Sequence, residues 1–92
     1  MMPTIRPNGT PPQDLVDQLT ETVGAARQLL RALQLSAPNA RDYQPWNGHQ
    51  QWRVATQEHA KRVHAADQLM RELDAMRESV IEQTEDQRRQ RR

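Results

Sequence analysis

The sequence contains no cysteine and no phenylalanine, and its aromatic residues are two tryptophans and one tyrosine in a chain of 92 residues. Without cysteine, disulfides and thiolate metal sites are excluded. No apolar run approaches the roughly 20 residues that span a bilayer. The first residues also lack the apolar segment of a secretory signal peptide. We therefore expect a protein of the cytoplasm or of an assembled particle.

Catalytic motifs are absent as well. The sequence has no glycine-rich phosphate loop and no serine in a nucleophile elbow. None of its three histidines, His49, His59 and His64, are four residues apart, the spacing that places two imidazoles on one helix face. Glu78, Glu82 and their neighbours are typical of a solvated helix face. We expect no enzyme activity, no cofactor and no metal.

What the sequence does contain is polar and suited to helices. Hydrophobic residues make up 35% of the chain, the mean hydropathy is -1.04, and the formal net charge is only +1. A chain of this length forms one small domain with a limited core. Such a composition favours long amphipathic helices, which bury only a narrow apolar stripe.

Helix signals divide the chain. Residues 1–9 are predicted to be an extended arm, and residues 10–86 a helical hairpin. Thr10 followed by Gln13 resembles a capping box, which predicts a first helix over about 11–35. That helix should end before Pro38, because the residue before a proline avoids helical torsions. Its apolar positions recur every three or four residues: Val16, Leu19, Val23, Ala26, Leu30 and Leu33, widened by Leu15 and Leu29.

A loop is expected over about 36–47 and a second helix over about 48–86, started by the capping pair Asn47 and Gln50, with a basic tail at 87–92. The second seam consists of Trp52, Ala55, His59, Val63, Ala66, Met70, Leu73, Met76 and Val80, widened by Leu69 and Ile81. The predicted fold class is all-α: a two-helix antiparallel hairpin with a longer second helix, completed by self-association or by a partner.

The unequal helix lengths suggest where a partner binds. At 1.5 Å per residue the first helix is about 36 Å long and the second about 60 Å. If the first helix folds back from the loop so that its N-terminal end lies opposite the middle of the second helix, the C-terminal part of the second seam lacks an intrachain partner. We expect this part to mediate self-association or partner binding: Met70, Leu73, Met76, Val80 and Ile81. The alternative is that Met1, Met2 and Ile5 of the arm cover it.

All three aromatic residues lie near the predicted loop. Tyr43 and Trp46 are within it, and Trp52 follows on the second seam. A loop of this length exceeds what helical bundles usually need, so it should be packed rather than open. The aromatic side chains are expected to plug the open end of the hairpin, with a recognition surface as the alternative.

Arginines dominate the last residues of the chain. Arg88, Arg89, Arg91 and Arg92 are candidates for contact with nucleic acid or an acidic partner, in which case affinity would fall with salt. The alternative is a helix end whose cations offset the negative end of the helix dipole. No aromatic residue lies nearby to stack on bases.

Trp46-Asn47-Gly48 is a W-x-G tripeptide between two predicted helices, near the middle of the chain. In this and in its length, the chain resembles the WXG100 family. The resemblance implies a helical hairpin that dimerises into a four-helix bundle and is exported by a type VII system. The chain departs from the family in its prolines at 38 and 45 and in lacking a C-terminal Tyr-x-x-x-Asp/Glu signal.

Together these patterns favour a non-enzymatic helical interaction or structural protein. It would act by helix–helix packing within a larger bacterial or bacteriophage assembly, or as a small adaptor or inhibitor of a larger machine. Its expected partners are further copies of itself or another protein, and no membrane. Two alternatives are a nucleic-acid-associated protein that uses the arginine tail and a WXG100-like secreted dimeric factor.

Overall fold

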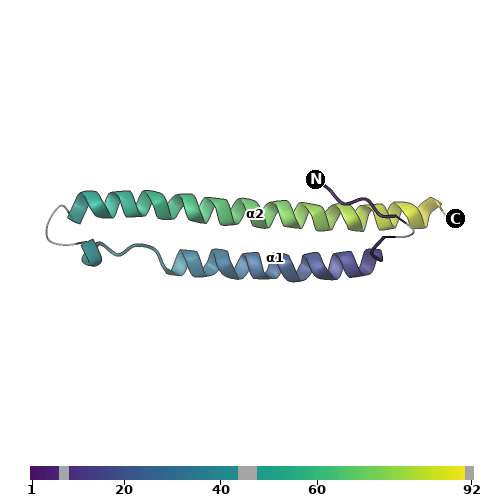
Figure 1. Cartoon of the computed structure of the whole chain (residues 1–92), viewed down its shortest axis with the longest axis horizontal. Coiled ribbons are helices and arrows are strands. Elements are labelled where there is room, and N and C mark those ends of the chain that lie inside the picture. Colours follow the sequence, from purple (N-terminus) through teal and green to yellow (C-terminus); the bar gives the residue numbers. More distant parts are fainter. Residues whose placement is uncertain (7–8, 44–47, 91–92) are drawn as a thin grey trace.

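The structure is a computed structural model that describes residues 1–6, 9–43 and 48–90. Helix α1 covers Pro12–Leu35, a short 3-10 helix η1 covers Ala40–Tyr43, and helix α2 covers Gly48–Gln90. The two long helices lie side by side and antiparallel (Figure 1), in a rod of 70 × 19 × 17 Å. The expected all-α hairpin with a longer second helix is confirmed, and the described residues contain no strand.

Helix α1 begins at Pro12, and the expected capping box at Thr10 does not form. The N-cap residue is Pro11, and no side chain caps this end of the helix. Pro11 precedes a second proline, which holds it out of the helical region, at φ -52° and ψ 140°. The amide of Gln13 instead donates to Asp17 Oδ1 at 2.8 Å.

The C-terminus of α1 is where the prolines predict it. The backbone N–H of Ser36 donates to the carbonyls of Ala32 and Leu33, and its hydroxyl also donates to Leu33 O, at 3.1 Å. Two residues later, Pro38 prevents the helix from continuing.

Residues 36–43 do not cross directly to α2 but continue along its first turns (Figure 1). Asn39 starts η1, since its side-chain oxygen accepts from Arg41 N and its carbonyl from Asp42 N, both at 3.0 Å. The Trp52 indole N–H donates to Pro38 O at 3.4 Å and so joins this linker to α2.

Because the linker occupies the first turns of α2, α1 pairs with the later part of α2. Pro12 and Val16 line a common groove with Ile81 and Thr84 at one end of this pairing. Leu30 and Gln34 share a second groove with Ala60 and Val63 at the other. The core within this contact is thin: its buried hydrophobic residues are Val23, Ala26, Ala66 and Val80.

The expectation that Val80 lacks an intrachain partner is therefore wrong. Its side chain is 0% exposed. The sequence estimate assumed that α1 starts opposite the middle of α2, but the linker shifts α1 by several turns toward the C-terminus. The excess length of α2 is thus taken up at the linker end of the hairpin.

Replacing Gly24→Ala should stabilise the hairpin. Gly24 lies within α1, and a Cβ added there meets no atom within 4 Å. Alanine should raise the free energy of unfolding by about 0.5–1 kcal/mol, because glycine loses more backbone freedom on folding. Urea denaturation followed by circular dichroism at one protein concentration measures this change. A lower unfolding midpoint would show that another helix needs the space beside Gly24.

Candidate functional site

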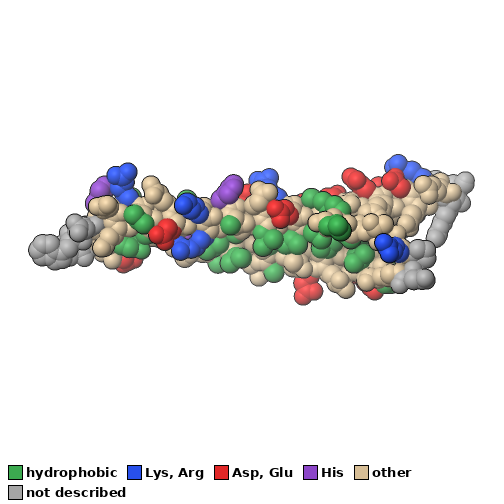
Figure 2. Space-filling view, turned by 45° about the horizontal axis from the view of Figure 1, so that its top comes forward, with side chains coloured by type: hydrophobic (Ala, Val, Ile, Leu, Met, Phe, Trp, Pro, Cys, Tyr) green, Lys and Arg blue, Asp and Glu red, His purple; other side chains and the backbone are tan. Residues whose placement is uncertain are grey.

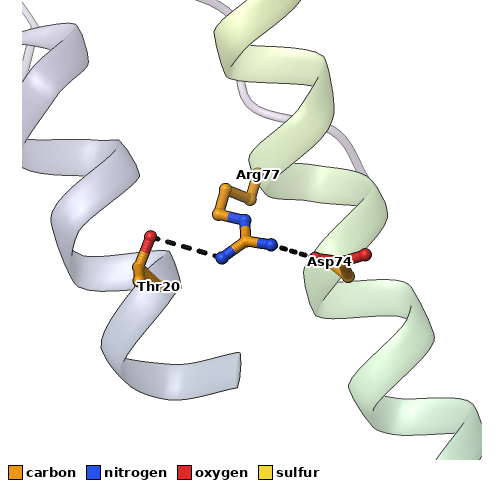
Figure 3. Close-up of polar contacts among 3 residues, drawn as sticks. All are labelled: Thr20, Asp74 and Arg77. Carbon is orange, nitrogen blue, oxygen red and sulfur yellow. Dashed lines mark hydrogen bonds and ion pairs between the residues drawn. The ribbon is translucent and has the colours of Figure 1, made fainter. Parts of the chain in front are cut away.

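The two long sides of the helix pair differ in chemistry. One is ionic: Arg71 Nε pairs with Asp67 Oδ2 at 2.9 Å, and Arg77 bridges the helices. Figure 3 shows the Arg77 guanidinium between Asp74 of its own helix and the hydroxyl of Thr20 on α1. These contacts occupy most of the polar groups on this side within the chain itself, although Nε of Arg77 is buried without a hydrogen-bond partner.

The opposite side carries exposed apolar residues on both helices together with one ion pair, Arg62 with Glu58 at 3.5 Å, and we call it the side face. Helical spacing places its members in one strip on each helix: Ala25, Leu29 and Ala32 of α1, and Ala65 and Leu69 of α2. Leu29 is 50% exposed and Leu69 is 48% exposed. Figure 2 shows hydrophobic side chains gathered along the middle of one long face of the hairpin.

The N-terminal arm runs beside the C-terminal half of α2 (Figure 1). Gln83 holds it at two points: its side-chain oxygen accepts from Ile5 N at 3.0 Å, and its amide donates to Pro3 O at 2.9 Å. Leu15 of α1 lines a cavity together with Met1, Met2 and other arm residues. Leu15 lies fourteen residues before Leu29, and Gln83 lies fourteen residues after Leu69, which is about four helical turns in each case. The arm therefore extends the side face toward the termini.

The surface area shows how incomplete the hairpin is. A compact monomer of 10.7 kDa exposes about 5,500 Å², whereas this chain exposes 7629 Å². The excess of about 2,100 Å² exceeds the roughly 800 Å² that each partner buries in a standard protein interface.

The residues that the sequence suggested for association are more buried within the chain than predicted. Val80 is in the intrachain core, and Met70, Leu73, Met76 and Ile81 are half-buried. The exposed leucines of the side face, Leu29 and Leu69, appear in the sequence only as residues that widen each seam. Their position beside each seam was the one signal in the sequence that could have indicated exposed leucines. Only the register of the two helices decides that Leu29 and Leu69 face the same side.

Two of the three aromatic residues are described, and both are half-buried. Tyr43 lines an open groove with Gln51, Val54 and other residues of α2, and Trp52 is tied to the linker by its indole N–H. Trp46 lies outside the described residues. The plug and the recognition surface thus remain two interpretations of the loop, and Trp52 has a structural role in either.

The arginines of the tail continue α2 to Gln90, four residues beyond the expected end of the helix. Arg88 and Arg89 are exposed, and Arg89 pairs with Asp86 at 3.7 Å. Arg91 and Arg92 lie outside the described residues. An exposed pair of this kind stabilises little, so Arg89 keeps most of its capacity to bind an anion.

Neither metal binding nor membrane crossing has a suitable site within residues 1–6, 9–43 and 48–90. No group of histidine and acidic side chains there is placed to hold a metal ion. Nor does any helix of that part have an apolar stretch long enough to cross a membrane. His59, a member of the predicted second seam, is half-buried, and its Nε2 atom has no hydrogen-bond partner.

Comparison of the chain with protein-family models, with curated proteins and with solved structures gave no match. The resemblance to the WXG100 family thus rests on the central tripeptide, the chain length and the two-helix layout.

Replacing Gln83→Ala should release the N-terminal arm, because both of its hydrogen bonds to Gln83 are lost at once. Such bonds contribute about 0.5–1.5 kcal/mol each. Hydrogen exchange at the Ile5 amide, followed by NMR, should rise toward the rate of an unstructured peptide. Gln57→Ala, on an exposed turn of the same helix, is the matched control and should change nothing. Unchanged protection of Ile5 in the first variant would contradict the assigned contact.

Proposed function

We propose that the chain is a non-enzymatic helical interaction protein that acts through helix–helix packing in a larger assembly, or as an adaptor or inhibitor of a larger machine. The observation that carries the proposal is the side face, where Leu29 and Leu69 stay half-exposed between alanines of both helices. Two neighbouring helices with apolar strips at this spacing form a groove into which a further helix packs.

The size of the apolar contact indicates what kind of partner is required. Full burial of a leucine side chain contributes about 1.5–3 kcal/mol, and Leu29 and Leu69 are already half-buried. Completing their burial therefore supplies about 2 kcal/mol, whereas micromolar affinity needs about 8 kcal/mol. The partner must accordingly run along much of the 70 Å rod rather than touch it at one point.

A helical partner meets this requirement, either another copy of the chain or a different protein. The proposed location is the cytoplasm or an assembled particle. A nucleic-acid-associated protein is the alternative, supported by the exposed Arg88 and Arg89 at the end of α2. A WXG100-like secreted dimer is a further alternative that rests on Trp46-Asn47-Gly48.

Photocrosslinking from the side face tests the main proposal. A benzoylphenylalanine at position 69 should crosslink to a protein when irradiated in cells of the source organism, since Leu69 lies at the centre of the exposed strip. Mass spectrometry would identify the crosslinked chain. The control is the same photoreactive residue at Glu78, an exposed position on the ionic side. Equal yields from the two positions, or none from position 69, would refute the proposal.

Removing residues 87–92 separates the main proposal from the nucleic-acid alternative. Under the main proposal the shortened chain should keep the crosslink from position 69, because the side face lies several turns before the tail. Retention on immobilised DNA and RNA at low and high salt is measured in parallel. Salt-sensitive retention that disappears with the tail would favour the alternative, because each arginine–phosphate contact releases counterions.

A further inference from the structure

We propose that the partner of the side face is a second copy of this chain, packed antiparallel, with the N-terminal arm of each copy in a groove of the other. The inference rests on the proposed function and names the partner for the same surface. Three features of one chain support it: the distribution of charge, the shape of the side face, and the position of its most exposed residues.

Charge is divided between the two halves of the hairpin. The half at the linker end, residues 27–68, carries six basic and three acidic side chains as well as all three histidines. The other half, residues 1–6, 9–26 and 69–90, carries five basic and nine acidic side chains. Antiparallel stacking of two copies brings each basic half over an acidic half. Parallel stacking would bring like charges together, which disfavours that orientation.

The shape of the side face leads to the same orientation. At the acidic half the arm adds bulk, because Gln83 holds Pro3 and Ile5 against α2. At the basic half α1 has already ended, and an open groove remains, lined by Tyr43, Gln50, Gln51, Val54, Ala55 and Glu58. The arm's first residue is fully exposed, and Val54 in the groove is 47% exposed. In an antiparallel pair the raised half of each copy meets the hollow half of the other.

The exposed leucines mark the centre of such a pair. Leu69 is the middle residue of α2. The antiparallel register in which Arg77 reaches Thr20 puts Leu29 of α1 at nearly the same level. A two-fold axis that lies in the plane between the two side faces, perpendicular to the rod and at this level, stacks α2 on α2 and α1 on α1. Residues equally far from Leu69 then face each other across the interface. Gln83, with its bound arm, would lie opposite Ala55 of the second copy, in the middle of the groove.

Because the chain has no cysteine, single cysteines can test the interface directly. Analytical ultracentrifugation of the full chain at about 100 µM should give twice the chain mass. Under mild oxidation Leu69→Cys should form a disulfide between two copies. Because position 69 lies near the two-fold axis, its Cα atoms in the two copies should approach the roughly 4.4–6.8 Å that a disulfide requires. Glu78→Cys, exposed on the ionic side, is the matched control and should stay monomeric on a non-reducing gel.

A mixing experiment tests the orientation and the seat of the arm. Thr4→Cys and Val54→Cys chains should form a mixed disulfide when combined, and little disulfide when each is oxidised alone. Within one chain the two positions lie toward opposite ends of the rod, so only an intermolecular contact explains the product. Thr56→Cys in place of Val54→Cys is the control: it lies two residues further along, which places its exposed side chain on the opposite side of the helix from Val54.

The results separate this inference from the proposed function. A monomer at 100 µM, or a dimer that gives neither the Leu69 nor the mixed disulfide, would overturn the antiparallel pair. If the photoreactive chain still captures a different protein from position 69, the proposed function stands without the second copy. If it captures nothing and the chain is monomeric, both fail. A dimer with both disulfides supports the pair and identifies the arm as part of its interface.

Discussion

A hairpin of two helices has one internal seam, and everything else in this molecule depends on how little that seam can bury. Each helix turns only one narrow stripe toward the other, so Val23 and Val80 are the only described side chains that lose nearly all contact with water. Additional apolar residues must remain on the flanks of the seam or be covered by other segments. The N-terminal arm covers one such flank, and the side face is the flank left open.

The linker decides which turns of the helices meet. Residues 36–43 run along the first turns of α2 and are held there by the Trp52 indole and by η1. This displaces α1 toward the C-terminus of α2 and buries Val80. Trp52, one of the aromatic residues near the loop, thus helps to hold the linker against the first turns of α2, where α1 does not reach.

The same register sorts the remaining side chains into two unlike sides. On one side, the register of α1 and α2 brings Thr20 next to Arg77, which also pairs with Asp74. Leu29 and Leu69 emerge on the other for the same reason. A side lined with ion pairs within the chain has less to gain from a partner, whereas an apolar side gains free energy when it is covered. This asymmetry underlies the proposed interaction and the proposed pairing of two copies.

The sequence by itself determined the two helices, because the three- and four-residue recurrence of apolar residues and the prolines that flank α1 are local signals. It also determined the end of α1 at Leu35, since Pro38 acts on its immediate neighbours. The start of α1 was missed by one residue, because two successive prolines outweigh a capping box. Tertiary structure alone decided the register, the course of the linker and the place of the arm. These depend on contacts such as Gln83 with Ile5 that join distant residues, and no local pattern in the chain specifies which distant residues meet.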